Sequence, residues 1–265
     1  MKIAVVSNKK IPNTKDIIAS LISSLEASNL EYDIIDLDNL KQGYDLVCSI
    51  GGDGTILKTA RFYSQTSTPI MGINMGRLGF LSLFSDKEIS QIGKIIKNGD
   101  YTLRERIMLK SADCLALNDI VIKGSSCART SKFNLFVNDR LVSDYIADGI
   151  IVATPTGSTA YGLSAGGPIL HPGVEAMVIV PICAHTMTAR PLVVPSNDVI
   201  KIQSVDEHLD MACDGQSTVK NIKEVKIEIA KNKTKLVFPK DYKFYSVLRN
   251  KLLWGVSPVS EGENI

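Results

Sequence analysis

The chain has 265 residues, with 30 Lys and Arg against 28 Asp and Glu, so its formal net charge is only +2. Charges of both signs are spread along the sequence without a basic stripe, which argues against nucleic acid or a membrane surface as a partner. This length can bury a sizeable core in one large domain or in two smaller ones, and we expect two unequal domains.

The cysteines and the N-terminal sequence indicate the cellular compartment of the protein. The five cysteines are odd in number, widely spaced and mostly inside apolar segments, which is typical of buried free thiols in a reducing compartment. The apolar run at residues 2–6 is too short for a signal sequence, and no apolar run approaches the length that spans a bilayer. We therefore expect a cytoplasmic protein.

Strand-like and helix-like segments alternate over the first hundred residues, which predicts an α/β domain with parallel strands. Strands are predicted at residues 2–6, 32–37, 46–50 and 70–74. The first predicted helix is capped by Asn13 or Thr14 and has apolar residues at helical spacing: Ile17, Ile18, Leu21, Ile22 and Leu25. Two more helices are predicted at residues 56–63 and 86–97, the last of which stops at Asn98-Gly99.

Beyond Tyr101 the pattern changes to short β-type runs separated by turn residues, which predicts a β-rich second domain. These runs are residues 116–122, 133–137, 149–153, 177–182, 199–202 and 225–229. Residues 245–253 are predicted as a helix. We expect residues 1–100 to form the first domain, with residues 240–265 packed back on it, and residues 101–239 to form the second.

The sequence Gly51-Gly52-Asp53-Gly54-Thr55 carries the strongest chemical signal. It follows a predicted buried strand and precedes a helix, so it lies at the carboxyl end of a parallel strand, where open α/β sheets bind ligands. Glycines let backbone amides approach phosphate oxygens, and a helix N-terminus favours anions. An acidic residue in such a turn would repel a phosphate unless the chemistry used it, which indicates that Asp53 is catalytic. The alternative is a tight turn in which Asp53 only caps the helix.

Further motifs follow the glycine turn. The chain contains no Walker lysine and no GxGxxG spacing, so neither a P-loop ATPase nor a simple dinucleotide fold is supported. The motifs that follow are residues 72–81 (Gly-Ile-Asn-Met-Gly-Arg-Leu-Gly-Phe-Leu), 106–109 (Arg-Ile-Met-Leu), Asn118-Asp119, 148–161 with 163–169, 185–186 with 189–192, and 214–216. In this order they resemble the NAD kinase family, and the Thr-Pro-Thr-Gly-Ser-Thr-Ala-Tyr block at residues 154–161 is specific to it.

The resemblance implies a fold and a reaction. The fold is an α/β N-terminal domain with a β-sandwich C-terminal domain and the active site between them. The reaction moves the terminal phosphate of ATP to the 2′-hydroxyl of the adenosine ribose of NAD, giving NADP and ADP, with magnesium or another divalent metal bridging the ATP phosphates. Asp53 would take the proton from that hydroxyl, and Gly54 would line the phosphates. A homodimer or homotetramer is also implied.

By the same resemblance, Asn118 and Asp119 hold the adenosine and ribose hydroxyls of NAD, although the family usually has Glu at the second position. Asp148 is expected to reach the dinucleotide, including from a neighbouring subunit, and Gln216 to contact it as well. Lys58 and Arg129 are candidate contacts to ATP or its phosphates. The residues of the hydroxyl-rich block that we expect to bind NAD are Thr159, Ala160, Tyr161, Gly162, Leu163 and Ser164.

Simpler interpretations remain open at this point. The hydroxyl-rich block could have no role beyond capping a helix at Ser158. Lys58 and Arg129 could be solvated surface charges. A lipid kinase with the same glycine turn would need an apolar surface near the site, and a non-catalytic NADP-binding sensor would not need an intact Asp53. No His/Cys spacing indicates a zinc site. The favoured hypothesis is a cytoplasmic kinase whose substrates are NAD and ATP.

Overall fold

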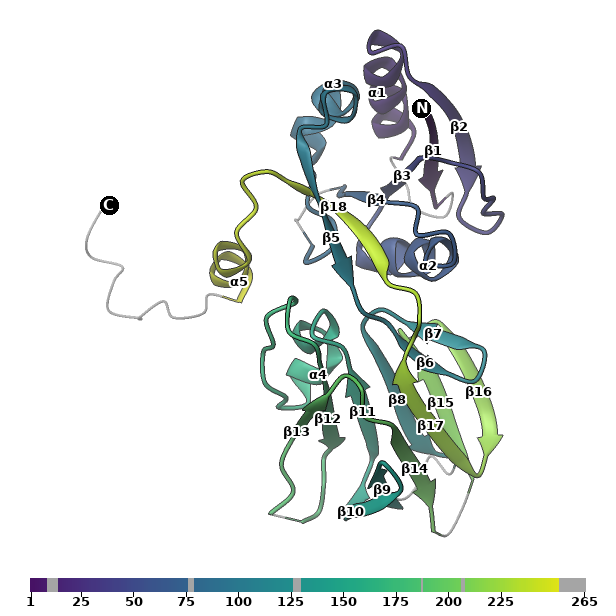
Figure 1. The fold of residues 1–265 in the computed structure, drawn as a ribbon, viewed down its shortest axis with the longest axis vertical. Coiled ribbons are helices and arrows are strands. Elements are labelled where there is room, and N and C mark those ends of the chain that lie inside the picture. Colours follow the sequence, from purple (N-terminus) through teal and green to yellow (C-terminus); the bar gives the residue numbers. More distant parts are fainter. Residues whose placement is uncertain (9–13, 76–78, 126–129, 187, 206–207, 253–265) are drawn as a thin grey trace, which may run out of the picture.

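The computed structural model describes residues 1–8, 14–75, 79–125, 130–186, 188–205 and 208–252. They form two lobes along the long axis of the molecule, an α/β domain and a β-sandwich domain (Figure 1). This arrangement confirms the predicted fold class. No helix in the described ranges has both the length and the apolar character needed to cross a membrane.

The α/β domain is built on a six-stranded sheet in the order β2-β1-β3-β4-β18-β5. Its strands are β1 (Lys2–Ser7), β2 (Glu31–Asp36), β3 (Leu46–Ile50), β4 (Ile70–Ile73), β5 (Tyr101–Arg106) and β18 (Thr234–Pro239). Neighbouring strands run parallel, except for β18 and β5. All five residues of the central strand β3 are buried, because helices cover both faces of the sheet.

The helices of this domain divide between the two faces. The helices α1 (Thr14–Ala27) and α3 (Ile89–Asn98) pack on one face, and α2 (Asp53–Tyr63) packs on the other. Leu21 and Leu25 of α1 are one helical turn apart and fully buried. A short 3-10 turn (Asp86–Glu88) precedes α3, and α3 ends where Gly99 takes a φ of 66°, a conformation that glycine adopts at little cost.

The second domain is a sandwich of two antiparallel sheets. One sheet has the order β10 (Arg140–Ala147), β9 (Ser131–Val137), β14 (Ile200–Ser204), β17 (Glu224–Ile229), β6 (Leu109–Ser111) and β7 (Cys114–Ala116). The other has the order β13 (Leu192–Pro195), β12 (Ala176–Ile182), β11 (Gly149–Ala153), β8 (Asp119–Gly124), β15 (Leu209–Cys213) and β16 (Ser217–Ile222). Alternate residues of both sheets point inward and share one apolar core.

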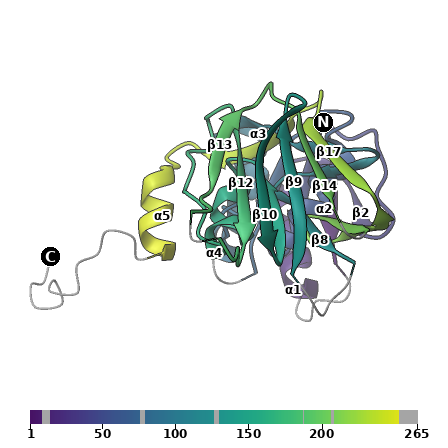
Figure 2. The same cartoon turned by 90° about the horizontal axis from the view of Figure 1, so that it is seen from below.

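Short elements cover the outer face of the second sheet. A 3-10 turn (Gly157–Thr159) and the short helix α4 (Tyr161–Ser164) follow β11, and Leu170 packs on the outer apolar cluster that contains Ile151 and Val178. The last helix, α5 (Phe244–Leu252), lies on the flank of the molecule beside the junction of the two lobes (Figures 1 and 2).

Most predicted elements match the structure within one or two residues, and α2 begins three residues earlier than predicted, at Asp53. Thr14 is the first residue of α1, whereas Asn13 lies outside the described residues. Two predictions need correction. The predicted strand at residues 116–122 is two strands, β7 and β8, which belong to different sheets. The strands β5 and β18, placed by the predicted boundaries in the β-rich domain, instead complete the first sheet, because pairing with β4 buries β18 on both faces.

The C-terminal helix contacts both domains. The rings of Phe244 and Tyr245 lie with their centroids 5.1 and 5.9 Å from that of His171 in the sandwich domain. Near the other end of α5, the Lys251 Nζ lies 5.3 Å from the ring centre of Phe80 in the α/β domain. The described part of the segment expected to pack on the first domain thus contacts both domains, and residues 253–265 lie outside the described ranges.

Candidate functional site

The glycine turn connects the buried end of β3 to the first residue of α2. The Gly51 N–H donates to the carbonyl oxygen of Ile73 at 3.0 Å, which ties the turn to the end of β4. Gly51 has a φ of 149°, and a Cβ there would lie 2.5 Å from Thr55 Oγ1, so only glycine fits. The amides at the start of α2 therefore stand at the carboxyl edge of the sheet, where they can receive an anion.

Asp53 is the first residue of α2, and the segment after β4 wraps around its carboxylate. Oδ1 accepts from the backbone N–H of Leu81 at 3.4 Å and from the N–H and the hydroxyl of Ser82 at 3.3 and 3.1 Å. Oδ2 accepts from the Phe80 N–H at 3.1 Å. A carboxylate oxygen has about two lone-pair sites, so Oδ2 keeps one for another donor. These contacts orient the side chain, and the residue as a whole is half-buried.

Gly79 makes this close approach possible. A Cβ on Gly79 would lie 1.9 Å from Asp53 Oδ1 and 2.3 Å from Ser82 Oγ. Such contacts are far inside van der Waals distance, so any side chain here would displace the Asp53 carboxylate. The motif at residues 72–81 therefore shapes the surroundings of Asp53.

A second buried carboxylate, Asp214, organises the segment between β7 and β8. Its oxygens accept from the backbone N–H groups of Leu117, Asn118 and Asp119 at 3.0, 2.8 and 3.2 Å. Burial raises the pKa of Asp214, while these amides and Arg61 act in the opposite direction. The Asp214 carboxylate takes the donors that a sheet partner would otherwise occupy, which explains why the predicted strand at residues 116–122 is broken here.

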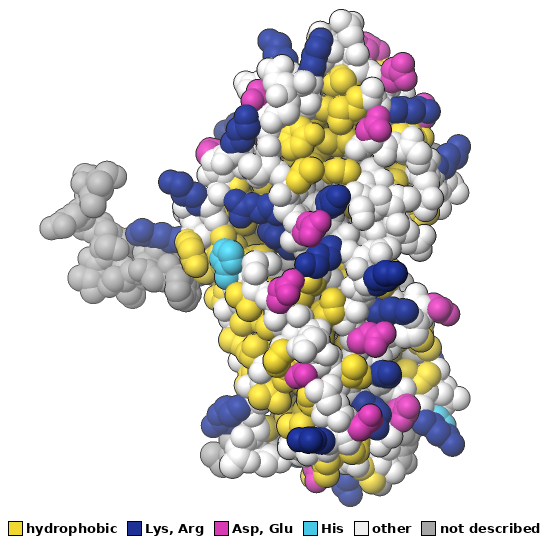
Figure 3. Space-filling view, viewed as in Figure 1, with side chains coloured by type: hydrophobic (Ala, Val, Ile, Leu, Met, Phe, Trp, Pro, Cys, Tyr) yellow, Lys and Arg dark blue, Asp and Glu magenta, His cyan; other side chains and the backbone are white. Residues whose placement is uncertain are grey.

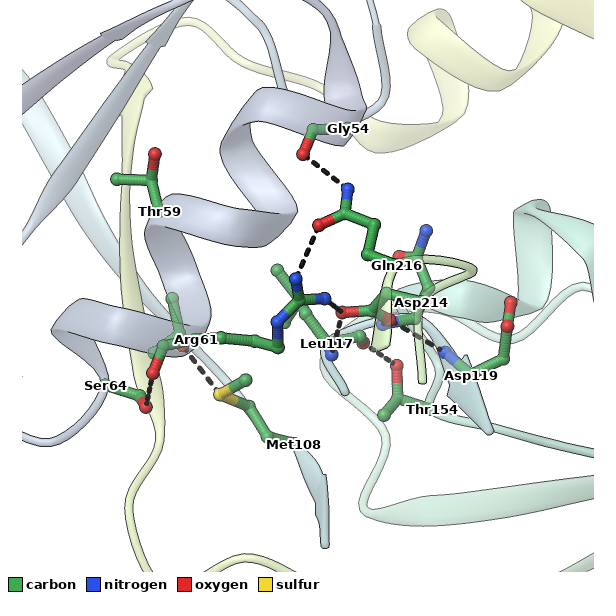
Figure 4. Close-up of polar contacts among 12 residues, drawn as sticks. Gly54, Thr59, Arg61, Ser64, Met108, Leu117, Asp119, Thr154, Asp214 and Gln216 are labelled. Carbon is green, nitrogen blue, oxygen red and sulfur yellow. Dashed lines mark hydrogen bonds and ion pairs between the residues drawn. The ribbon is translucent and has the colours of Figure 1, made fainter. Parts of the chain in front are cut away.

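Arg61 connects this carboxylate to the glycine turn (Figure 4). From α2, its Nη1 donates to Asp214 Oδ2 at 3.2 Å and its Nη2 donates to Gln216 Oε1 at 2.5 Å. The Gln216 side chain donates in turn to the carbonyl oxygen of Gly54 at 2.7 Å. One continuous chain of polar contacts therefore runs from the start of α2 to the backbone of Asn118 and Asp119 in the other domain.

A cavity of about 470 Å³ opens on the sandwich side of this chain. Its lining residues are Asn118, Asp119, Val121, Lys123, Ala160, Tyr161, Asp210, Met211, Ala212, Asp214, Gly215 and Thr218. The Thr154 hydroxyl fixes one wall, because it donates to the Leu117 carbonyl at 2.6 Å and accepts from the Gly157 N–H at 3.0 Å. Tyr161 keeps 40% of its surface exposed and so presents a ring to the cavity.

Asp119 is the titratable group of this cavity whose pKa is raised furthest. The residue is 5% exposed, and burial together with the charge of Asp214 raises the pKa of its carboxyl to about 7. Its backbone is held on both sides, since its N–H bonds to Asp214 and its carbonyl accepts from the Asp214 N–H at 2.9 Å. The carboxyl is therefore fixed in place and can exchange a proton near neutral pH.

A more polar cavity of about 750 Å³ lies beside the glycine turn. Its lining residues are Asn8, Leu37, Asp38, Gly52, Gly54, Thr55, Lys58, Arg61, Gln216 and Ser217. The Lys58 Nζ is 2.6 Å from Asp38 Oδ1, and both side chains remain solvent-accessible. The two cavities meet at the turn between β15 and β16, where Asp214 and Gly215 border the first and Gln216 borders the second.

The structure brings together one group of the predicted site residues. Asn118, Asp119, Ala160 and Tyr161 line the first cavity, and Gly54, Lys58 and Gln216 line the second. No cluster of three His, Cys, Asp or Glu side chains among the described residues could hold a metal ion.

Other predicted site residues do not line the two cavities of their own chain. Asp148 is an exposed residue before β11, at the opposite end of that strand from Ala153, which pairs with Asp119. Five residues of strand separate the two ends by roughly 17 Å. Among the described residues, Thr159, Gly162, Leu163 and Ser164 do not line either cavity, although they follow Gly157, whose absent Cβ lets it pack on the Asn118 backbone. Arg129 lies outside the described residues.

The sequence analysis did not predict three residues that make polar contacts in the site: Arg61, Ser82 and Asp214. For Arg61 a signal was available, because Gly54, Lys58 and Arg61 are spaced by four and three residues and so share one face of α2. For Asp214 the motif at residues 214–216 drew attention to Gln216 alone. No local pattern could have shown that Ser82 approaches Asp53, because the contact depends on how the segment after β4 folds back.

Comparisons with known proteins match most of the chain. Family models for the ATP-NAD kinase N-terminal and C-terminal domains match residues 9–101 and 117–240. The NAD kinase of Clostridium botulinum (strain 657 / Type Ba4) is 42% identical over 247 residues, which cover 88% of this chain and 86% of that protein. The NAD kinase of Legionella pneumophila (strain Corby) is 37% identical over 258 residues, which cover 91% and 87%.

Two solved structures are similar over nearly the full chain. An NAD kinase from Archaeoglobus fulgidus in complex with ATP matches with a TM-score of 0.79 and 29% identity, covering 96% of this chain and 99% of that one. Yeast NADH kinase complexed with NADH matches with a TM-score of 0.82 and 25% identity, covering 97% and 89%.

We expect Asp119→Asn to stabilise the protein more at about pH 8 than at about pH 5. The Asp119 carboxyl has a pKa of about 7 in the folded chain, whereas an aspartate ordinarily has a pKa of 3.8, so between these pH values the folded chain keeps a proton that the unfolded chain has lost. Stability is therefore lost as pH rises from about 4 through 7. The extra gain from the substitution at the higher pH is roughly 1 to 3 kcal/mol.

Urea unfolding at both pH values, followed by circular dichroism, measures this difference. The exposed Asp16→Asn is the matched control and should change stability equally at both. If the gain from Asp119→Asn is the same at the two pH values, the raised pKa is refuted.

Proposed function

Because this chain belongs to the NAD kinase family, we propose how its own residues carry out the family reaction. The enzyme transfers the terminal phosphate of ATP to the 2′-hydroxyl of the adenosine ribose of NAD, giving NADP and ADP. The observation that supports our assignment most strongly is the oriented Asp53 carboxylate at the start of α2, between Gly52 and Gly54, which line the cavity beside the glycine turn.

We assign the proton transfer to Asp53. Three backbone amides and the Ser82 hydroxyl hold the carboxylate in a single orientation, and Oδ2 accepts from only one of them. That oxygen is the one we expect to accept the hydroxyl proton as the ribose oxygen attacks the phosphate. Phosphoryl transfer depends mostly on positioning and charge stabilisation, so a carboxylate of ordinary basicity is sufficient.

We assign the phosphates of ATP to the cavity beside the glycine turn. Gly52 and Gly54 present backbone there, and the N-terminus of α2 contributes a partial positive charge. Lys58 lies one helical turn from Gly54. Its ammonium group can leave the surface ion pair with Asp38 and bind a phosphate oxygen instead. The solved relative that binds ATP agrees with this class of ligand.

We assign NAD to the more apolar cavity. Its volume of about 470 Å³ is within the usual range for small-molecule sites. Tyr161 offers a flat face for a base, and Asn118 and the Asp119 carboxyl offer acceptors for the ribose hydroxyls. Since Asp119 is one methylene shorter than Glu, its reach depends on the hydrogen bonds that hold its backbone toward the cavity.

Magnesium enters this proposal as part of the nucleotide substrate. The described residues contain no cluster of three acidic, thiol or imidazole side chains, so they do not fit a metal site built by the protein itself. We therefore place the divalent ion on the ATP phosphates, whose charge it neutralises, and assign no side chain to it.

We also propose a homodimer or homotetramer in which Asp148 serves the site of a neighbouring subunit. The edge strand β10 exposes Leu141, Val142 and Ile146, which keep 56, 46 and 40% of their surface accessible. Such apolar side chains on an unpaired edge favour association, and Asp148 directly follows this strand. The four described cysteines are free, as expected in the cytoplasm, where we propose that the enzyme works.

Purified protein should form NADP from NAD and magnesium-ATP, and Asp53→Asn should lower kcat by about a hundredfold or more with little change in either KM. NADP formation is followed with an NADP-specific dehydrogenase. Asp16→Asn, the same change on the exposed surface of α1, should keep full activity. Lack of NADP formation by the wild type refutes the function, and near wild-type turnover of Asp53→Asn refutes the role of that residue alone.

Asp119→Ala and Tyr161→Ala should raise the KM for NAD far more than the KM for ATP. Removing an acceptor for ribose hydroxyls or a stacking face costs on the order of 1 to 3 kcal/mol in binding. Lys58→Ala, on the other cavity, should show the reverse preference. Steady-state kinetics with each substrate varied in turn measures both constants, and a larger rise for ATP in the Asp119 and Tyr161 variants would contradict the assignment of the cavities.

Light scattering during size-exclusion chromatography should give a mass of two or four chains. Replacing Leu141 and Ile146 by arginine should reduce that mass and raise the KM for NAD, because the Asp148 of a neighbour is lost with the interface. The matched control replaces the exposed Val219 of β16 by arginine and should leave the mass unchanged. A monomeric wild type with full activity would exclude this role for Asp148.

A further inference from the structure

A separate basic cavity lies where the two lobes meet the start of α5. Its volume is about 160 Å³, and its lining residues are Arg104, Arg106, His171, Pro172, Gly173, Tyr242 and Phe244. None of these residues lines either substrate cavity. On the face shown in Figure 3, basic side chains gather between the lobes beside a histidine.

Arg106 is the most deeply buried cation of this cavity. Its residue is only 6% exposed, and within the described ranges no carboxylate lies within 4 Å of its guanidinium. Its Nη1 donates to the adjacent Glu105 carbonyl at 3.0 Å, and the guanidinium lies 4.9 Å from the ring centre of Phe238. Burial, with the nearby charge of Arg104, lowers the pKa of Arg106 to about 10. A buried cation without a counter-charge is costly, so an anion in this cavity would stabilise it.

Arg104 adds a second cation on the same side of β5. The two arginines are two residues apart along the strand, so both side chains project from one face. The Arg104 guanidinium stacks 4.9 Å from the ring centre of Tyr242 and 5.2 Å from that of Phe238. Aromatic stacking orients both planar groups and leaves their N–H edges available, which suits the recognition of an oxyanion.

His171 supplies a donor from the other domain. Its Nδ1 accepts from the Gly173 N–H at 3.1 Å, so the neutral ring carries its proton on Nε2. The ring is positioned by an edge-on contact with Phe244, the first residue of α5. The N-terminus of α5 adds a partial positive charge at the same point.

We propose that this cavity binds one phosphate-sized oxyanion, either inorganic phosphate or the phosphate group of a small phosphorylated metabolite. Its volume is below the range of nucleotide-sized pockets, which excludes a whole nucleotide. Arg104 and Arg106 belong to the α/β domain and His171 to the sandwich domain, so one anion contacts both lobes. Binding therefore holds the domains in their observed relation, and it raises the unfolding temperature of the protein.

Isothermal titration of the full-length protein with inorganic phosphate, at an ionic strength held constant with chloride, tests this site. Arg106→Gln and Arg104→Gln should each weaken binding by about tenfold or more, because each removes charge-assisted hydrogen bonds. Arg106→Lys, which keeps the charge but loses the planar fork, should have an intermediate effect. The exposed Arg140→Gln is the matched control and should bind phosphate like the wild type.

The glycine turn could also receive phosphate, so the same titration is made with Lys58→Ala. Binding that survives in Lys58→Ala and is weakened in Arg104→Gln supports the proposal, whereas the opposite pattern, or no binding at millimolar phosphate, overturns it. Glucose 6-phosphate in a parallel titration separates the sources: tighter binding than phosphate indicates a phosphorylated metabolite, and weaker binding indicates the free anion. Thermal unfolding of each variant without ligand verifies that it folds. If Arg106→Gln does not fold, Arg104→Gln still tests the site, because Arg104 is only half-buried.

Discussion

The ion pair between Asp214 and Arg61 joins the two halves of the catalytic site. The Asp214 carboxylate lies under residues 117–119, accepts three of their N–H groups and binds the guanidinium that α2 extends across the domain junction. A carboxylate with a fully buried side chain is tolerated only when its charge and hydrogen bonds are satisfied. Both domains must therefore sit in one relative position for this group to be stable, and that position also sets the distance between the glycine turn and the cavity lined by Asp119 and Tyr161.

The carboxylates of the site differ in chemistry because their surroundings differ. Asp53 lies at a helix N-terminus among four hydrogen-bond donors, and its Oδ2 accepts from only one of them. Asp119 is 5% exposed and near the charge of Asp214, so its pKa rises to about 7. These surroundings fit the roles proposed above, in which Asp53 accepts the proton and Asp119 binds the ribose hydroxyls. Separation of roles by environment is the usual way in which one site uses several acids.

Apolar packing supports this polar junction. The core cluster on the α2 face of the first sheet extends to Met108 and Ala230, which lie on the segments that enter and leave the sandwich, and to Leu117 between β7 and β8. The hydroxyl of Thr234 in β18 contacts the Met108 sulfur at 2.9 Å. Because β5 and β18 carry the chain out to the sandwich and back, the domains share a continuous core rather than a flexible linker. The polar contacts at the site consequently rest on a rigid support.

Local sequence alone determined the elements and the chemistry of the glycine turn. Helical and strand periods depend on residues within a few positions of each other, so β3, α2 and five of the sandwich strands (β9, β11, β12, β14 and β17) were predictable. The glycines with Asp53, and the motifs that follow, were sufficient to indicate the family, its fold class and seven of the residues that line the two cavities. These features are properties of short segments and their order.

Only the tertiary structure decided which distant segments meet. The break at residues 117–118 exists because Asp214 takes their N–H groups, and the place of β5 and β18 in the first sheet follows from pairing with β4. The contacts of Arg61 and Ser82, and the separation of Asp148 from the cavities of its own chain, likewise depend on long-range packing. Sequence periodicity records which face of an element is apolar, but it does not record which partner covers that face, and the site is assembled from those partners.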